Sequence, residues 1–187
     1  QSFVEELQRY FADVLERLLE GSPSETARRV GDLWPRIAEE YSRPGYQQLQ
    51  ERAPIHGDLN ASNVMLPQDG AASMKVIDWE WAGTGVLHAD LASLLKSQEP
   101  GLEQQVALAF FRQDERLSME EHRQLYLWCQ LERALMDASY VGAQSMAQSG
   151  PTKFNLPAFA ESSLEHATRR YDQLIGQQPL WDDNEGR

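Results

Sequence analysis

The chain has 187 residues and carries 17 lysines and arginines against 29 aspartates and glutamates, which gives a formal net charge of −12. Such acidity works against binding a polyanion through a broad basic face, so we expect no nucleic-acid partner. No run of about eighteen apolar residues is present to span a bilayer, and residues 1–20 lack the apolar stretch of a secretory signal. We therefore expect one soluble domain over residues 1–187, located in the cytoplasm, with no membrane partner.

Apolar residues recur at helical spacing over most of the chain. The pattern predicts an amphipathic helix over 3–19 and a second helix over 24–41, which Pro35 is expected to kink or break. Further helices are predicted over 90–97, 102–113, 118–149 and 158–175. Ser118 and Glu121 have the spacing of a capping box at the start of the 118–149 helix.

Two short apolar runs in the middle of the chain consist mainly of β-forming residues. They cover 64–66 and 74–77 and flank the turn sequence Pro67-Gln68-Asp69-Gly70, so they predict a small antiparallel hairpin. Everything after this hairpin is expected to be helical. The predicted fold class is therefore mainly α, of the α+β kind, with one small hairpin.

The segment His56-Gly57-Asp58-Leu59-Asn60-Ala61-Ser62-Asn63 lies directly before the hairpin. Phosphoryl transfer to a hydroxyl needs a carboxylate that orients the hydroxyl and accepts its proton. It also needs a neutral oxygen ligand for a metal ion that offsets the phosphate charge. Asp58 fits the first role and Asn63 fits the second. The spacing therefore makes this segment a candidate catalytic loop.

Asp78 ends the second predicted strand, fifteen residues after Asn63. A strand end can aim a carboxylate at the same site as the loop. Mg²⁺ prefers hard oxygen ligands and often keeps several waters, so one Asp and one Asn completed by triphosphate oxygens make a suitable shell. We therefore expect Asp78 to bridge Mg²⁺ to the nucleotide, and we expect no other metal.

Three motifs carry a resemblance to a known family: 56–63 (HGDLNASN), 76–85 (VIDWEWAGTG) and 88–95 (HADLASLL). In order and spacing they resemble the aminoglycoside phosphotransferase and choline kinase superfamily, a branch of the protein-kinase-like fold. The resemblance implies that residues 55–95 hold the catalytic and metal motifs of a helical C-terminal lobe. It also implies ATP as phosphate donor, Mg²⁺ as cofactor and the hydroxyl of a small molecule as acceptor.

Carried over residue by residue, the resemblance makes Asp58 the catalytic Asp. Asn63 and Asp78 become the ligands of Mg²⁺ and thereby bind the nucleotide. His56 becomes a residue that braces the loop, not the base. Asp90 is expected to be structural and to cap backbone amides at the start of its own helix.

Two positions depart from the pattern of protein kinases. Trp79-Glu80 stands where protein kinases have Phe-Gly after the metal Asp, and Gly57 stands where they have Arg. An activation-loop phosphate would need that Arg. Both departures therefore favour a small-molecule kinase.

Several other residues have a structural explanation beside a functional one. Residues expected to fill the core share helical spacing: Trp128, Leu131, Leu135 and Met136. Cys129 is expected to be a buried structural thiol. The histidines without a ligand-spaced partner for zinc are expected to be surface or structural: His88, His122 and His166. Glu132 and Asp137 either face the acceptor cleft or lie on a solvated helix face, and the second interpretation is favoured.

A working kinase of this kind also needs a glycine-rich loop over the phosphates and a strand lysine paired with a helical glutamate, which lie in a β-rich N-terminal lobe. The chain contains no Gly-x-Gly-x-x-Gly, and Lys75 and Lys96, the lysines near the motifs, both follow Asp58. We therefore expect that the nucleotide-clamping N-terminal lobe is missing and that this fragment alone is inactive.

Two functions stay open at this point. The first is an ATP-dependent phosphotransferase that acts on a hydroxyl of an aminoglycoside, a choline-like amine, homoserine or a sugar. The second is a non-catalytic pseudokinase or stand-alone C-terminal lobe that binds a ligand or partner through the same cleft. The sequence leaves the acceptor, and ATP against GTP as donor, undecided.

Overall fold

The computed structural model describes residues 53–67, 73–96, 98–147 and 156–174, together with Asp32, Pro35, Glu39 and Gly176. The helix predicted over 3–19 lies outside these residues. Of the helix predicted over 24–41, the three described residues, Pro35 among them, are helical and exposed. The residues on either side of Pro35 lie outside the described part of the chain, so the kink or break expected there stays a prediction. The chain divides into two compact units, Gln48–Gln130 with Pro179–Arg187 and Gln1–Gln47 with Leu131–Gln178.

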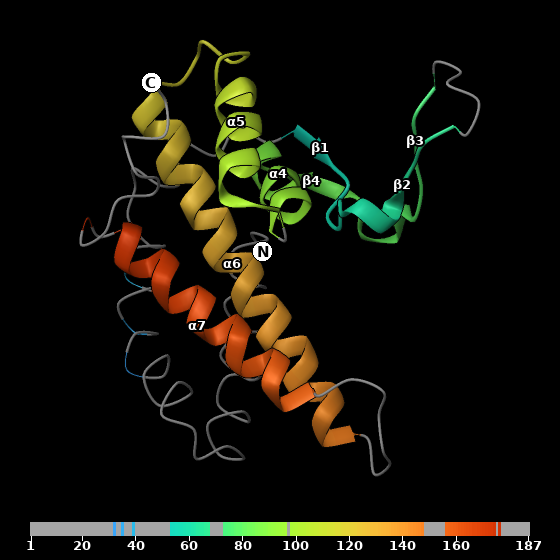
Figure 1. Cartoon of the computed structure of the whole chain (residues 1–187), viewed down its shortest axis with the longest axis vertical. Helices are drawn as coiled ribbons and strands as arrows, with labels where there is room; N and C mark the ends of the chain where they lie inside the picture. The colour runs from blue at the N-terminus through green and yellow to red at the C-terminus, as the bar shows by residue number, and fades with distance from the viewer. Residues whose placement is uncertain are drawn as a thin grey trace. The chain divides into compact units, whose positions relative to one another are not determined.

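Two small antiparallel sheets frame the candidate catalytic loop (Figure 1). Strand β2 (Val64–Met65) pairs with β3 (Lys75–Val76), with Val64 opposite Val76. This is the predicted hairpin, which is confirmed. Strand β1 (Ala53–Ile55) pairs with β4 (Gly83–Gly85), with Ile55 opposite Gly83.

The β1–β4 pair corrects the expectation that everything after the hairpin is helical. Strand β4 reads Gly-Thr-Gly, which has almost no β-forming side chains. Its place in the sheet comes from close packing: a Cβ added at Gly85 would come within 2.5 Å of Ile55 Cδ1. Glycine therefore allows β4 to lie against the strand that leads into the loop.

Three helices follow in this unit: α4 (Leu87–Leu95), α5 (Pro100–Phe111) and the first part of α6 (Met119–Ala147). Helix α5 starts at a proline, whose missing N–H is not needed there. Ser118 and Glu121 form the predicted capping box, with Ser118 N donating to Glu121 Oε2 at 2.7 Å and Glu121 N donating to Ser118 Oγ at 3.3 Å. Sequence periodicity thus located the helices, with boundaries shifted by one to three residues.

A buried apolar cluster joins the three helices. Its members are Leu91, Ala92, Leu95, Ala107, Phe111, Tyr126 and Cys129. Each fully buried large side chain contributes roughly 1.5–3 kcal/mol relative to an exposed one, so this cluster fixes α4 against α5 and α6. The prediction of a buried thiol at Cys129 is confirmed.

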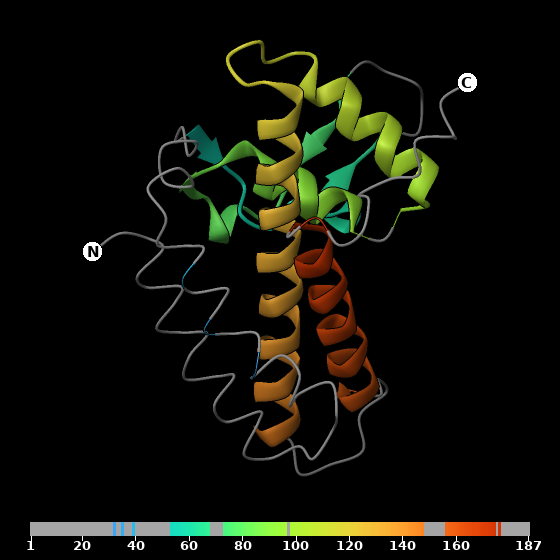
Figure 2. The same cartoon turned by 90° about the vertical axis from the view of Figure 1, so that its left-hand side faces the viewer.

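In the other unit, the second part of α6 lies beside α7 (Leu156–Leu174), as Figures 1 and 2 show. The residues that were expected to fill the core are mostly buried, with Leu131 and Leu135 almost fully so and Met136 half-buried. Glu132 and Asp137 are half-buried, and Arg133 Nε donates to Asp137 Oδ1 at 3.1 Å. Among the described residues, no helix is long and apolar enough to cross a membrane.

Candidate active site

The loop after β1 turns into a short 3-10 helix, η1 (Ala61–Asn63), directly before β2. Asn60 caps this helix: its side-chain oxygen accepts a hydrogen bond from Ser62 N at 3.0 Å and another from Ser62 Oγ. This is the usual role of Asn at a helix N-terminus. The cap directs Asn63, at the other end of η1, back towards the loop.

Two side-chain amides hold Asp58. Asn60 Nδ2 donates to Asp58 Oδ2 at 3.2 Å, and Asn63 Nδ2 lies 3.4 Å from the same oxygen. The same two nitrogens also donate to the backbone carbonyl of Asp58, at 3.2 and 2.9 Å. Asp58 is half-buried and Asn63 is buried. These hydrogen bonds hold the Asp58 carboxylate in one orientation while part of the residue stays accessible to solvent.

His56 joins the loop to the segment that carries Asp78. Its Nδ1 accepts a hydrogen bond from Asp58 N at 3.3 Å, and its Nε2 lies 2.8 Å from the carbonyl oxygen of Ile77. A carbonyl only accepts, so the proton is on Nε2 and Nδ1 carries the lone pair. The buried ring also packs against Trp79, with 4.7 Å between ring centroids. The His56 side chain therefore bonds to the backbone of Asp58 and to the backbone of Ile77, the residue before Asp78.

Asp90 has different partners from those predicted. Helix α4 starts at Leu87, before Asp90, and its N-cap residue makes no side-chain cap hydrogen bond. The carboxylate of Asp90 instead accepts the amides of the loop, from His56 N at 2.7 Å and from Gly57 N at 2.9 Å. Hydrogen bonds to a charged acceptor are about twice as strong as neutral ones, so Asp90 anchors the loop to α4.

Gly57 is required by its surroundings. Its φ is 81°, in the left-handed region, and an added Cβ would fall on the carbonyl oxygen of Trp81 and 3.0 Å from its carbonyl carbon. A side chain at position 57 would therefore push apart the two segments that surround Asp58. This explains the absence of the protein-kinase Arg in steric terms.

Asp78 lies between β3 and the 3-10 helix η2 (Trp79–Trp81), with an exposed side chain. Its φ and ψ are 66° and 60°, which makes it the non-glycine residue with positive φ in the described part of the chain. Ile77 N donates to Asn63 O at 3.0 Å, extending the β2–β3 pairing by one step. Asn63 and Asp78 therefore lie at the same end of the hairpin.

The structure thus links His56, Asp58, Asn63 and Asp90 in one hydrogen-bond network, and Asp78 joins it through Ile77. Sequence reasoning assigned no role to Asn60, although an Asn two residues before a Ser is a recognisable capping signal. It also gave no role to the backbone of Ile77 or Trp81, because nearly every residue carries the same backbone groups and the sequence does not indicate which of them make contacts.

The donor set fits Mg²⁺. Within the described residues, no group of three His, Cys, Asp or Glu side chains is placed to hold a metal ion. The oxygens on offer come from Asp58, Asn63 and Asp78. A small number of hard oxygen ligands, completed by water and phosphate, is the usual shell of Mg²⁺ at nucleotide sites.

Comparison with known proteins agrees with this arrangement. The model of the phosphotransferase enzyme family known as APH matches residues 2–128. The chain belongs to this family. Its mainly helical α+β architecture is the one expected for the C-terminal lobe of such proteins.

Curated relatives of this family member include thiamine kinases of Salmonella. The thiamine kinase of Salmonella typhimurium (strain LT2) is 29% identical over 102 residues, which cover 54% of this chain and 35% of the relative. That of Salmonella paratyphi B is 32% identical over 73 residues, which cover 39% of this chain and 25% of the relative. The matched part of the chain therefore spans about a third or less of the length of these relatives.

Proposed function

We propose that the chain carries the catalytic loop of a Mg²⁺- and ATP-dependent kinase that phosphorylates a hydroxyl of a small molecule. The observation that carries this proposal is the fixed carboxylate of Asp58, held through Oδ2 by Asn60 and through its backbone carbonyl by Asn63. A base for phosphoryl transfer has to be held in a defined orientation, because catalysis in this reaction is mostly positioning and electrostatic stabilisation.

In the proposed reaction, the acceptor hydroxyl donates its proton to Asp58. The acceptor oxygen forms a bond to the γ-phosphorus, the bond from that phosphorus to the β–γ bridging oxygen breaks, and ADP leaves. Asp58 acts on the acceptor and not on ATP. Its removal should therefore affect turnover far more than nucleotide binding.

Asn63 and Asp78 are the proposed ligands of Mg²⁺. The Nδ2 of Asn63 is bonded to Asp58, so the amide oxygen is the atom left to bind a cation. Asp78 supplies a carboxylate from the same end of the hairpin. Bound Mg²⁺ supplies positive charge that offsets the charge developing on the phosphates. The left-handed backbone of Asp78 is of the strained kind that occurs at functional sites.

The hairpin also offers a surface for the nucleotide base. Val64 and Val76 pair directly, so side chains alternate and Met65 and Ile77 project from the opposite face. Met65 is 53% exposed and Ile77 is 42% exposed. Ile77 directly precedes Asp78, and Met65 follows Asn63 by two residues. Lys75 pairs with Met65, so it lies on the same face and is also exposed. The exposed apolar side chains of Met65 and Ile77 suit one side of a purine ring.

The acceptor is proposed to be a small alcohol, with thiamine as the first compound to test because the matched relatives are thiamine kinases. A coupled ADP-release assay on the full-length protein should use thiamine, choline, homoserine, an aminoglycoside and glucose in parallel. We expect acceptor-dependent ADP release with one of these classes, and its loss in Asp58→Asn. Binding of Mg²⁺-ATP without turnover on any acceptor would favour the non-catalytic alternative.

A further inference from the structure

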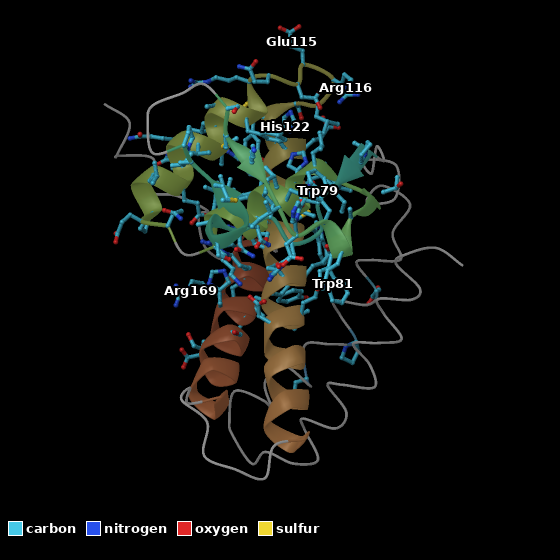
Figure 3. All side chains as sticks on the ribbon, turned by 90° about the vertical axis from the view of Figure 1, so that its right-hand side faces the viewer. Trp79, Trp81, Glu115, Arg116, His122 and Arg169 are labelled. Carbon is cyan, nitrogen blue, oxygen red and sulfur yellow. The ribbon has the colours of Figure 1, made fainter. Side chains whose placement is uncertain are left out.

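Two buried histidines join α4 to α6. His88 on α4 is 4% exposed and His122 on α6 is 0% exposed, and their rings are joined by a contact of 2.9 Å between His88 Nε2 and His122 Nδ1. The same His122 ring, labelled in Figure 3, has its Nε2 2.9 Å from the backbone carbonyl of Asp114. Both rings were expected to be surface or structural, and the structure shows that they are buried.

The hydrogen bonds that run from the Asp114 carbonyl through His122 to His88 have a fixed direction. The carbonyl of Asp114 only accepts, so His122 donates from Nε2 and has its lone pair on Nδ1. That lone pair accepts from His88 Nε2, which therefore carries the proton of His88. The remaining atom, His88 Nδ1, is buried and has no hydrogen-bond partner. Both imidazoles are thus neutral, and an additional proton would have to be placed on an atom with nothing to donate to.

The surroundings oppose a positive charge on His88. The rings of Phe110 and Phe111 on α5 pack against it, with centroid distances of 5.4 and 5.8 Å. Burial and then the neighbouring His122 lower the pKa of His88 to about 4, while the carboxylate of Asp114 acts in the opposite direction.

The charged groups near the pair lie on the connection to α6 and on α6 itself. Asp114 is held by Arg116, whose Nε donates to it at 2.7 Å. Hydrogen bonds from Arg116 and from Ser118 lower the pKa values of the Asp114 and Glu121 carboxyls, respectively. Asp114, Arg116 and Glu121 therefore lie near His122, at the opposite end of this row of hydrogen bonds from the unpartnered Nδ1 of His88.

Helix α4 also carries Asp90, two residues after His88. Asp90 holds the amides of His56 and Gly57, next to Asp58 in the sequence. One short helix is therefore bonded on one side to the buried pair and on another to the catalytic loop. A shift of α4 would change the position of Asp90 and of the two amides together.

We propose that His88 is a positioning residue for phosphoryl transfer: its hydrogen bond to His122 fixes α4, and through Asp90 it fixes the loop that carries Asp58. This inference rests on the proposed function. It assigns a role in the reaction to a side chain that touches neither substrate, and it requires that both rings stay neutral.

The test compares two substitutions at one position in the full-length protein. His88→Gln keeps a donor where Nε2 lies and has no titratable group, whereas His88→Phe keeps a ring and removes the donor. Leu91→Ala, in the buried cluster of the same helix, is the control for a loss of stability alone. The measurements are kcat, the KM for Mg²⁺-ATP, and the hydrogen-exchange rates of the His56 and Gly57 amides.

We expect His88→Phe to lower kcat by roughly tenfold with little change in the KM for Mg²⁺-ATP, and to speed exchange at both amides by a similar factor. His88→Gln should stay within about threefold of the wild type in both measurements. Leu91→Ala should lower the melting temperature without this selective change. Equal behaviour of His88→Phe and the wild type, or equal loss in Leu91→Ala, would overturn the inference.

A measurement on the wild type tests the inference even if the His88→Phe protein does not fold. As the pH falls, amide exchange at His56 and Gly57, corrected for its intrinsic pH dependence, should rise over the range in which the ring signals of His88 titrate. His88→Gln, which lacks the titrating ring, should lack this component; an unchanged profile would overturn the inference. If the wild type shows no kinase turnover but the amides respond as expected, the proposed function fails while the link between His88 and the loop stands.

Discussion

The imidazole of His56 donates from Nε2 to the carbonyl oxygen of Ile77 at 2.8 Å, across 21 positions of the chain. Ile77 directly precedes Asp78, and Nδ1 of the same ring accepts from Asp58 N. The two nitrogens of one ring therefore hold the two carboxylate-bearing segments separately. This separation allows substitutions at position 56 to remove one bond at a time.

His56→Gln keeps a donor near Nε2 and loses the acceptor for Asp58 N, whereas His56→Asn keeps the acceptor and loses the bond to Ile77. A hydrogen bond contributes about 1 kcal/mol, or about fivefold in an equilibrium. We expect His56→Gln to lower kcat with little effect on Mg²⁺-ATP affinity, and His56→Asn to weaken that affinity. Steady-state kinetics with calorimetry would measure both, and identical effects of the two variants would contradict the division of roles.

Asp58→Asn should lower kcat by roughly a hundredfold or more, because the amide cannot accept the proton of the acceptor hydroxyl. The affinity for Mg²⁺-ATP should change little, since Asp58 acts on the acceptor. Single-turnover kinetics and nucleotide titration separate the two quantities. A large loss of nucleotide affinity would mean that Asp58 acts mainly on the metal.

Asp78 tests the other half of the site. Asp78→Asn removes a charged ligand, so it should weaken Mg²⁺-ATP binding as well as turnover. Asp78→Gly should do the same while the free energy of unfolding stays within about 1 kcal/mol of the wild type, because glycine relieves the left-handed backbone but is more flexible when unfolded. Equal nucleotide affinity in Asp78→Asn and the wild type would remove Asp78 from the metal site.

Much of this arrangement could be predicted from the sequence, for reasons that are local. Helical periodicity located α4 to α7, and the spacing of Ser118 and Glu121 identified their capping box. The hairpin followed from two β-forming runs around a turn. Each of these signals lies within a few residues of the feature that it predicts.

What could not be predicted depends on contacts between distant positions. Asp90 has the local pattern of a helix cap, yet it binds amides 33 and 34 positions earlier. The His88–His122 contact also spans 34 positions, and the sequence left open whether either ring is at the surface or structural. Strand β4 has no β-forming pattern and depends on the fit of Gly85 against Ile55. Tertiary packing decided each of these cases.

Gly57→Ala should destabilise the protein by about 2 kcal/mol or more, because alanine is unfavourable at positive φ and its Cβ would meet the Trp81 carbonyl. Turnover should fall as well, since Asp58 is the next residue. Gly101→Ala is the matched control: Gly101 lies in α5 with nothing within 4 Å of an added Cβ, so it should stabilise by roughly 0.5–1 kcal/mol. Chemical denaturation would measure both; a neutral Gly57→Ala would contradict the packing described.

The buried histidine pair predicts a specific dependence of stability on pH. The folded-state pKa of His88 is about 4, below the ordinary value of 6.5, so the unfolded state binds more protons between these values. This contribution is therefore fully present above about pH 6.5 and is lost as the pH falls towards 4, by about 3 kcal/mol at most. Asp114 and Glu121, whose pKa values are lowered by hydrogen bonds from Arg116 and Ser118, lose their contributions only as the pH falls through their own lowered values.

Urea unfolding at intervals between pH 7.5 and 4 should therefore show a loss of stability that His88→Gln largely abolishes, because glutamine cannot take up the proton. The matched comparison at each pH is Leu91→Ala, which lowers stability by removing apolar contacts and leaves the titrating groups in place. In Leu91→Ala the curve should be displaced downwards with the same shape as in the wild type. If His88→Gln kept the full loss between pH 6.5 and 4, another group would have to bind the proton on unfolding, and the buried pair would not be the source of the acid sensitivity.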